Sequence, residues 1–317
     1  MPLQRDLGVL QRRLHLDGPL LTGLLLLSCA GLVVLYSASN ESLATLRGQL
    51  IRLGIAFVIM VAVAQVSPER MRRWAPIVFL AGLLALLLVP LIGLTGKGAQ
   101  RWLEVAGVRF QPSELMKLVL PMMIAWLLSR QTLPPHWTQV LLALVVITVP
   151  SGLIVAQPDL GTGILVISSG LFVLFLAGLR WRWIIAAALG LLALVPVFWH
   201  FLMYDYQRTR VLTLFDPSRD PLGSGYHIIQ SSIAIGSGGL LGKGWLNSTQ
   251  ARLEFLPERN TDFIFAVFSE EFGLVGVLLL LLLYLTIILR GLYIAVQAQD
   301  SFGRLLGGSL ALTFSVY

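Results

Sequence analysis

The sequence predicts an all-α fold, a polytopic bundle of membrane-spanning helices, and three observations support this prediction. Hydrophobic residues make up 56% of the 317 residues, charged residues make up only 12%, and the mean hydropathy is +0.82. The apolar residues form continuous runs, and most of these approach the roughly 20 residues that a helix needs to cross a bilayer. Because the runs do not alternate with polar residues, a transmembrane β-barrel is excluded. We expect residues 1–317 to form a single integral membrane domain.

Nine apolar helices are expected in chain order. They cover residues 19–36, 49–66, 76–94, 114–128, 139–156, 160–179, 183–203 and 263–289, followed by a last run that begins near residue 305. This last run stops at residue 317 and is too short to span a bilayer, so we expect the chain to be truncated at its C-terminal end. A polar loop covers residues 95–113, and a long loop covers residues 204–262.

The basic residues predict the orientation of the chain in the membrane. One side of the alternating path holds Arg5, Arg12, Arg13, Arg70, Arg72, Arg73, Arg130, Arg180, Arg182, Arg290 and Arg304. The short loops of the other side hold Arg47, Arg52, Lys97, Arg101 and Arg109. Cytoplasmic loops carry the excess of arginine and lysine, so the N-terminus is expected in the cytoplasm and the 204–262 loop outside it.

Charge and cysteine content exclude two other classes of function. The formal net charge is +7, but most arginines flank apolar runs, where they orient helices, so we expect no nucleic-acid binding. Cys29 is the only cysteine. A disulfide within the chain and a cysteine-based metal site are therefore excluded.

Two Gln-Pro pairs mark the outer ends of predicted helices, and each is followed by an acid, Glu114 and Asp159. Proline suits a first helical turn, and an acid there complements the helix dipole, so one interpretation is helix capping. Lys117 lies three residues after Glu114, one turn deeper in the bilayer, where a lysine needs a partner or a water-filled cavity. It pairs with Glu114 in one interpretation and binds an anionic ligand in the other.

The most polar stretch beside a predicted span covers residues 236–271 and contains Asp262. Asp262 is either a cap of the following helix or a functional acid. Lys243 and Arg259 lie nearby, and Glu270 and Glu271 lie two turns inside the following span. Acids at that depth are costly, so they face a partner or a pore, or pair with basic residues of neighbouring helices.

The glycine-rich run from Gly236 to Gly244 is not a nucleotide-binding loop. The position five before Gly242 is Ser237, and Lys243 is followed by glycine rather than serine or threonine, so the run departs from the phosphate-loop pattern. We expect a tight, close-packed turn. Its backbone N–H groups are still able to meet an anion.

Together these segments resemble the SEDS family (shape, elongation, division and sporulation), and within it the rod-shape-determining RodA branch. The resemblance rests on Gly98-Ala-Gln-Arg-Trp102, Phe110-Gln-Pro-Ser-Glu-Leu-Met-Lys117, Gln157-Pro-Asp-Leu-Gly-Thr162, Tyr226-His-Ile-Ile-Gln230, Ile233-Ala-Ile-Gly-Ser-Gly-Gly-Leu-Leu-Gly-Lys-Gly-Trp245, Ser248-Thr-Gln250, Leu256-Pro-Glu258 and Thr261-Asp-Phe-Ile-Phe-Ala266. The family has about ten spans, of which about nine are expected here.

The resemblance implies a peptidoglycan glycosyltransferase of the bacterial inner membrane that polymerises lipid II, with Asp262 as the essential residue. It also implies a class B penicillin-binding protein (a transpeptidase) and other elongation-complex membrane proteins as partners. The chemistry fits, since a sugar hydroxyl that attacks an anomeric carbon needs a general base. A lipid II flippase and a scaffold for the penicillin-binding protein are the alternatives.

The departing pyrophosphate needs positive charge. The predicted substrate-binding residues are Arg101, Glu114, Lys117, Asp159, Arg210, Lys243 and Arg259. No cofactor is firmly predicted. A divalent cation, magnesium or manganese, on Glu114, Asp159 or Asp262 is an alternative source of charge.

Overall fold

The structure is a computed structural model that describes residues 14–96, 99–105, 107–130, 132–157, 159–179, 181–203, 205–219, 224–253, 255 and 259–316. Several residues named above lie outside this part: Arg5, Arg12, Arg13, Lys97, Gly98, Pro158, Arg180, Leu256 and Glu258. The chain divides into two compact units, each described by itself below. The first comprises Met1–Val63 and Ile185–Ile287, and the second comprises Ala64–Ile184 and Ile288–Tyr317.

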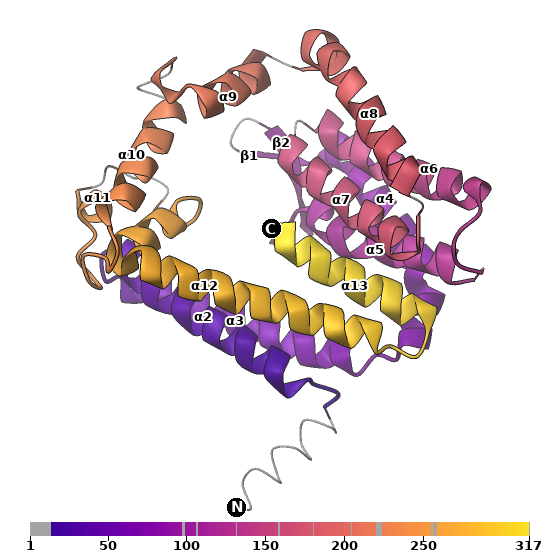
Figure 1. Ribbon diagram of the computed structural model, residues 1–317, viewed down its shortest axis with the longest axis horizontal. Helices are drawn as coiled ribbons and strands as arrows, with labels where there is room; N and C mark the ends of the chain where they lie inside the picture. Colours follow the sequence, from indigo (N-terminus) through magenta and orange to yellow (C-terminus); the bar gives the residue numbers. More distant parts are fainter. Residues whose placement is uncertain are drawn as a thin grey trace, which may run out of the picture. The chain divides into compact units, whose positions relative to one another are not determined.

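The chain is nearly all helical, which confirms the predicted fold class (Figure 1). In the described ranges, six helices are long and apolar enough to cross a membrane: α2 (Gly18–Ala38), α3 (Leu43–Ala64), α4 (Pro68–Ile92), α5 (Pro112–Ser129), α6 (Trp137–Ala156) and α12 (Ile264–Val296). The other predicted runs form shorter helices: α7 (Leu160–Leu176), α8 (Trp181–Val197) with a π-helical turn after it (Phe198–Leu202), and α13 (Ser301–Val316). Each of the nine predicted apolar runs is therefore helical.

Helix α4 begins eight residues earlier than predicted, so residues 68–75, which lie between two predicted spans, are helical and do not form a loop. Arg70, Arg72 and Arg73 lie in the first turns of α4, after Ser67 in an extended conformation and Pro68. A proline and an acid in the first turn favour a helix start, and Glu69 supplies that acid. Its carboxylate lies 3.7 Å from the Arg73 guanidinium one turn later.

The segment 95–113 was predicted as a polar loop, but it contains three short strands. They are β1 (Leu94–Gly96), β2 (Ala99–Val105) and β3 (Val108–Phe110), and they form an antiparallel sheet in the order β1-β2-β3. Gly107 has a positive φ of 80° between β2 and β3, a conformation that glycine adopts without steric cost. Arg101 lies in β2, and only Gln111 separates β3 from the start of α5.

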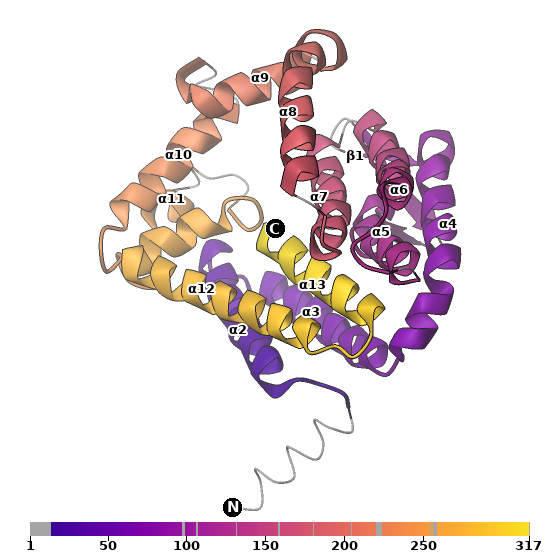
Figure 2. The ribbon, with the colours of Figure 1, turned by 45° about the vertical axis from the view of Figure 1, so that its right-hand side comes forward.

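The 204–262 segment, predicted as a long loop, is partly helical. It contains α9 (Asp205–Phe215), a 3₁₀ turn (Pro217–Arg219), α10 (Ser224–Ser237) and α11 (Thr249–Arg252). Figures 1 and 2 show these elements following one another to the start of α12. The helices bring the polar residues before Asp262 back to the beginning of α12.

The core of the second unit lies between α4, α5, α6, α7 and α13, and it is built from buried aliphatic side chains around Ile124 and Ile147. A Cβ atom added at Gly170 of α7 would lie 2.7 Å from Ile147 and 3.0 Å from Ile124. Within a bilayer, helices associate through such close van der Waals packing rather than through exclusion of water. The glycine therefore lets α7 approach α5 and α6.

In the first unit, α2 packs along α12. A Cβ atom at Gly23 would lie 2.9 Å from Ile287, and Ala38 packs against Val267 at the other end of α2. Helix α12 is not continuous, because Gly273 has a φ of 63° and a ψ of −166°. It consists of a short helical piece before Gly273 and a longer one after it, and Asp262 lies just before the short piece.

Candidate functional site

A cluster of polar side chains joins the sheet to the starts of α5 and α7. Nη1 of Arg101 lies 3.8 Å from Oδ2 of Asp159, and Nε2 of Gln111 donates to the same oxygen at 2.9 Å. Nε of Arg101 also donates to the backbone oxygen of Gln157 at 3.2 Å. The two Gln-Pro helix starts are therefore neighbours, which their separation in the sequence does not reveal. We call Arg101, Gln111, Gln157 and Asp159 the Arg101–Asp159 cluster.

Asp159 also caps α7, as the capping interpretation expected. Its Oδ1 accepts a long hydrogen bond of 3.4 Å from the backbone N–H of Thr162, which satisfies one of the unpaired donors of a helix start. The other carboxylate oxygen takes the Arg101 and Gln111 contacts. Capping and charge pairing therefore use different oxygens of one carboxylate.

Glu114 and Lys117 form the ion pair that was expected as one of two interpretations. Nζ of Lys117 lies 2.7 Å from Oε2 of Glu114. The Lys117 side chain is only 7% exposed, whereas that of Glu114 is 49% exposed. The buried Lys117 cation is thus paired on its own helix with a carboxylate that is half-exposed. Anion binding by Lys117 stays a prediction.

Asp262 occupies a turn that covers residues 259–263, before α12 begins at Ile264. The residue is exposed. Within the described ranges no hydrogen bond or ion pair to its carboxylate is formed, so Asp262 does not cap α12 there. With respect to the described residues, both carboxylate oxygens are available to accept a hydrogen bond from a ligand.

Three predicted cations accompany Asp262 in the first unit. Arg259 lies in the same turn and is half-buried, and Lys243 follows the glycine run. Arg210 lies in α9, but its side chain is outside the described part. Nζ of Lys243 is already paired, at 2.6 Å from Oε1 of Glu270 and 2.9 Å from Oγ1 of Thr249, which favours a structural role for this lysine.

The sequence singled out Glu270 and Glu271 as costly acids but did not identify their partners. Glu270 is fully buried. It pairs with Lys243 and accepts further hydrogen bonds from Ser237, Ser248, Thr249 and Gln250. Glu271 accepts a hydrogen bond from the hydroxyl of Ser37 on α2. Both acids thus have partners within the first unit: those of Glu270 lie between Ser237 and Gln250, and that of Glu271 lies on α2.

The glycine run is the close-packed turn that was expected. A Cβ atom at Gly238 would lie 2.1 Å from the backbone oxygen of Ser269, and one at Gly242 would lie 2.1 Å from that of Glu271. These distances are far inside van der Waals contact, so a side chain at either position would force α12 and the run apart. The run therefore lies directly on α12 around the interruption at Gly273.

The predicted site residues fall in both units. Asp262 and the cations around it belong to the first unit, whereas Arg101, Glu114, Lys117 and Asp159 belong to the second. A shared site built from all of them stays a prediction. Among the described residues, no group of three histidine, cysteine, aspartate or glutamate side chains is arranged to hold a metal ion, and the divalent cation likewise stays a prediction.

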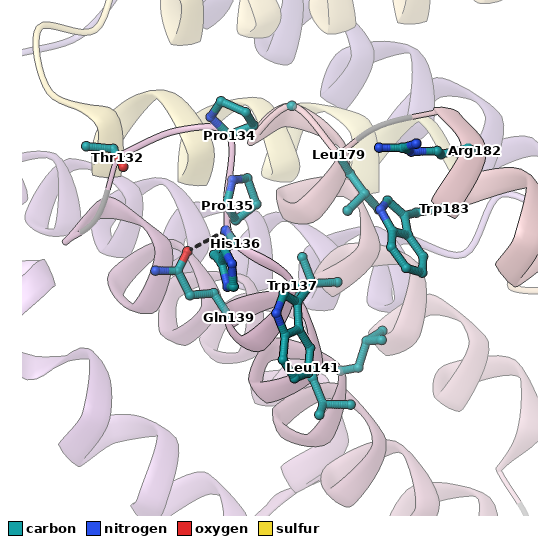
Figure 3. Close-up of a pocket in the computed structure, with 13 residues that line it drawn as sticks. Thr132, Pro134, Pro135, His136, Trp137, Gln139, Leu141, Leu179, Arg182 and Trp183 are labelled. Atoms are coloured by element: carbon teal, nitrogen blue, oxygen red, sulfur yellow. Dashed lines mark hydrogen bonds between the residues drawn. The ribbon is translucent and has the colours of Figure 1, made fainter.

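Two cavities are lined by described residues. One, of about 680 Å³, lies between the start of α6 and the connection from α7 to α8, and it is lined by Trp137, Arg182 and Trp183 among others (Figure 3). None of the predicted site residues lines it. The other, of about 380 Å³, lies between α2, α3 and the start of α12, where Asn260 and Thr261 contribute to its wall.

Comparison with known proteins identifies the family. The model of the FtsW/RodA/SpoVE cell cycle protein family matches residues 19–317. The chain is 52% identical over 305 residues to the peptidoglycan glycosyltransferase MrdB of Escherichia coli, covering 96% of this chain and 82% of that protein. It is 36% identical to a probable peptidoglycan glycosyltransferase FtsW of Geobacter metallireducens, covering 88% of this chain and 77% of that protein.

Solved structures agree with this assignment. A chain from a peptidoglycan synthase complex, described as coordinating polymerization and crosslinking, matches with a TM-score of 0.79 and 30% identity over 94% of this chain and 83% of its own length. The rod shape determining protein RodA of Thermus thermophilus matches with a TM-score of 0.68 and 27% identity over 94% and 81% of the two chains. The chain therefore belongs to the SEDS family of cell cycle proteins, which includes FtsW, RodA and SpoVE.

Proposed function

We propose that this protein is a peptidoglycan glycosyltransferase that polymerises lipid II into glycan strands during cell elongation and so maintains rod shape. The 52% identity to a peptidoglycan glycosyltransferase over 96% of the chain carries the proposal. Asp262 supports it, because an exposed carboxylate without a partner among the described residues fits a group that must accept a proton from a substrate.

Asp262 is the general base of the proposed reaction. The attacking sugar hydroxyl forms a bond from its oxygen to the anomeric carbon of a second lipid II molecule. The bond from that carbon to the pyrophosphate oxygen breaks, and the pyrophosphate leaves with the electron pair. Asp262 takes the hydroxyl proton, which requires hydrogen-bond reach to the attacking oxygen.

Positive charge stabilises the leaving pyrophosphate, and the proposed sources are Arg101, Lys117, Arg210, Lys243 and Arg259. Arg101 and Lys117 are already paired with Asp159 and Glu114. An arriving pyrophosphate would replace these carboxylates as partner of the cations, and the released acids would accept hydrogen bonds from sugar hydroxyls. A bound magnesium or manganese ion would add charge beside the same carboxylates.

The proposed location follows from the arginine distribution. The chain lies in the bacterial inner membrane with a cytoplasmic N-terminus and an extracytoplasmic active site. A class B penicillin-binding protein and other elongation-complex membrane proteins are its proposed partners. A matching chain from a complex that couples polymerization with crosslinking supports this part of the proposal.

The test is glycan polymerisation from purified lipid II by the purified full-length protein in detergent. Asp262→Asn should remove polymerisation while leaving thermal unfolding unchanged. Asp300→Asn is the matched control, because Asp300 accepts from the backbone N–H of Gly303 and an asparagine oxygen still caps that turn. Polymerisation by Asp262→Asn at the wild-type rate would refute the role of Asp262.

The same assay separates the two alternatives. No transport is possible in detergent, so glycan strands made there exclude a lipid II flippase as the whole function. If the protein is only a scaffold for the penicillin-binding protein, its whole function is to bind that partner, and it makes no glycan strands itself. An Asp262→Asn protein that still binds its partner but makes no strands would contradict that alternative.

A further inference from the structure

A buried carboxylate inside α12 has no role in the mechanism above. Glu270 lies two turns after the start of α12, and its side chain is 0% exposed. A buried carboxylate without partners would cost several kcal/mol in solvation. A residue of this type at this depth is retained in a stable fold only where its partners offset that cost.

The partners of Glu270 come almost entirely from one stretch of the loop before Asp262. Its carboxylate accepts from Nζ of Lys243 at 2.6 Å and from Oγ of Ser248 at 2.5 Å. Thr249 donates twice, from its hydroxyl at 2.6 Å and its backbone N–H at 3.0 Å, and the N–H of Gln250 donates at 3.3 Å. We call Glu270 and these four donor residues the Glu270 anchor.

The anchor is strong because the acceptor carries charge. Hydrogen bonds to an ionised group are worth roughly twice those between neutral groups. The N–H groups of Thr249 and Gln250 also belong to the first turn of α11, where backbone donors lack partners within the helix. Glu270 therefore both fixes the loop and completes the start of α11.

The segment held by the anchor ends at Asp262. Gln250 donates to Glu270 at one end, and Asp262 lies at the other end, two residues before α12 begins at Ile264. Glu270 and Asp262 are eight residues apart in the chain, which corresponds to about 12 Å along a helix. Gln250 and Asp262 are therefore both joined to the same short piece of α12, Gln250 by a hydrogen bond and Asp262 through the chain.

Asp262 depends on that segment for its position. Its carboxylate has no hydrogen-bond or ion-pair partner within the described ranges, so no such interaction there orients it. A general base must stay within hydrogen-bond reach of its proton, and a displacement of about 1 Å can cost two orders of magnitude in rate. The backbone on either side must supply the precision.

We propose that Glu270 is a positioning residue, which holds the segment 243–252 on α12 and thereby keeps Asp262 in place for catalysis. This inference rests on the proposed function for its effect on rate. Its structural part, that Glu270 immobilises the segment, is independent of any activity. Two measurements on the full-length protein test the two parts separately.

The first measurement is cleavage by trypsin at Arg252, an exposed residue at the end of α11. Glu270→Gln keeps the size of the side chain but removes its charge and replaces one acceptor oxygen with an NH2 group. This group is itself a donor and faces the donors of the anchor. The substitution should speed cleavage at Arg252 by about five-fold or more. Ser269→Ala is the matched control, because the adjacent buried Ser269 donates only within α12, to the backbone oxygen of Phe265. It should leave the cleavage rate unchanged.

The second measurement is steady-state polymerisation of lipid II. Glu270→Gln should lower kcat about ten-fold or more, with KM within about two-fold, since a displaced base slows the chemical step without removing a substrate contact. Glu270→Asp retains the charge and should recover part of the lost rate. Thr249→Val removes one donor of the anchor and should change both readouts in the same direction by a smaller factor.

The outcomes are decisive for each part. Wild-type cleavage at Arg252 in both Glu270→Gln and Thr249→Val refutes the anchor. Faster cleavage with an unchanged kcat refutes the positioning of Asp262. If Glu270→Gln fails to fold, Thr249→Val decides by the same two criteria. A wild-type protein without polymerisation would refute the proposed function while leaving the cleavage result valid.

Discussion

The two polar regions of the chain are held together in different ways. In the second unit, cations and acids pair directly, Arg101 with Asp159 and Lys117 with Glu114. In the first unit, glycine contacts and the ion pair of the buried acid Glu270 with Lys243 hold the loop, and Asp262 has no partner within the described ranges. Paired charges suit a surface that exchanges partners with a substrate, whereas a carboxylate without a partner suits proton transfer.

The largest effect is expected at Asp262. Loss of a general base typically costs about 10²- to 10⁴-fold in rate, so Asp262→Asn should lower kcat by a factor in this range. Polymerisation of lipid II in detergent measures the effect, and unchanged thermal unfolding excludes misfolding. A loss of kcat of less than about five-fold would contradict the role of Asp262 in proton transfer.

The next effect concerns the glycine contacts of the first unit. Gly242 has a φ of 79°, and its Cβ position lies 2.1 Å from the backbone oxygen of Glu271. Gly242→Ala should lower stability by about 2–3 kcal/mol through backbone strain and displacement of the run, as measured by thermal unfolding in detergent.

Gly236→Ala is the control from the same run. Its Cβ position has no heavy atom within 4 Å, and Gly236 lies in α10, where alanine is favoured over glycine. It should be neutral or slightly stabilising. Equal losses of stability in Gly242→Ala and Gly236→Ala would show that the close contact at Gly242 does not determine the stability of the run.

A smaller effect is expected at Lys117. Lys117→Met keeps the length of the side chain and removes the charge. If Lys117 binds pyrophosphate, kcat/KM should fall about ten-fold or more, the value of one hydrogen bond to a charged group. If it serves only the ion pair with Glu114, the change in kcat/KM should be small, because the Glu114 side chain is 49% exposed and stays solvated without its partner.

Arg109→Gln is the control for Lys117. The Arg109 side chain is 70% exposed and lies 2.9 Å from Glu104 on the sheet. An exposed ion pair is worth at most about 1 kcal/mol, so both stability and kcat/KM should remain near wild type. A comparable loss of kcat/KM in Arg109→Gln would mean that general positive charge, rather than Lys117, matters.

The smallest effect separates the two roles of Asp159. Asp159→Ala removes the cap of α7 and should cost about 1 kcal/mol of stability. Asp159→Asn keeps a capping oxygen and removes the charge beside Arg101, so its loss should be smaller. Thermal unfolding of both variants gives the two contributions. Equal losses would show that the charge, not the cap, stabilises this helix start.

Much of this architecture could be predicted from the sequence. Long apolar runs predicted each described helix that is long enough to span a membrane. A backbone inside a bilayer must satisfy its own hydrogen bonds, and an α-helix does so. The start of α4 was missed although its signals are local: Ser67, Pro68 and Glu69 form a good helix start, but three arginines suggested a loop. The sheet was missed because its strands are short and depend on the turn at Gly107.

The partners of the site residues could not be predicted from the sequence. The spacing of Glu114 and Lys117 was sufficient, since residues three apart share a helix face. By contrast, Asp159 and Gln111 are 48 residues apart, and nothing local indicates that β2 brings Arg101 to them. The depth of Glu270 in its span indicates a costly acid, but its donors lie 20 to 33 residues earlier in the chain, and no local pattern pairs them with it.

The interruption of α12 at Gly273 would leave several peptide groups without helical partners. The glycine run replaces them: Lys243 and Gly244 donate to the carbonyls of Glu270 and Glu271, while Leu274 and Val275 donate to those of Gly239 and Leu240. Inside a bilayer each unsatisfied group would cost several kcal/mol. These four backbone hydrogen bonds connect residues 239–244 to residues 270–275 of α12. The glycine run therefore joins the two pieces of α12, because it bonds to residues on both sides of Gly273.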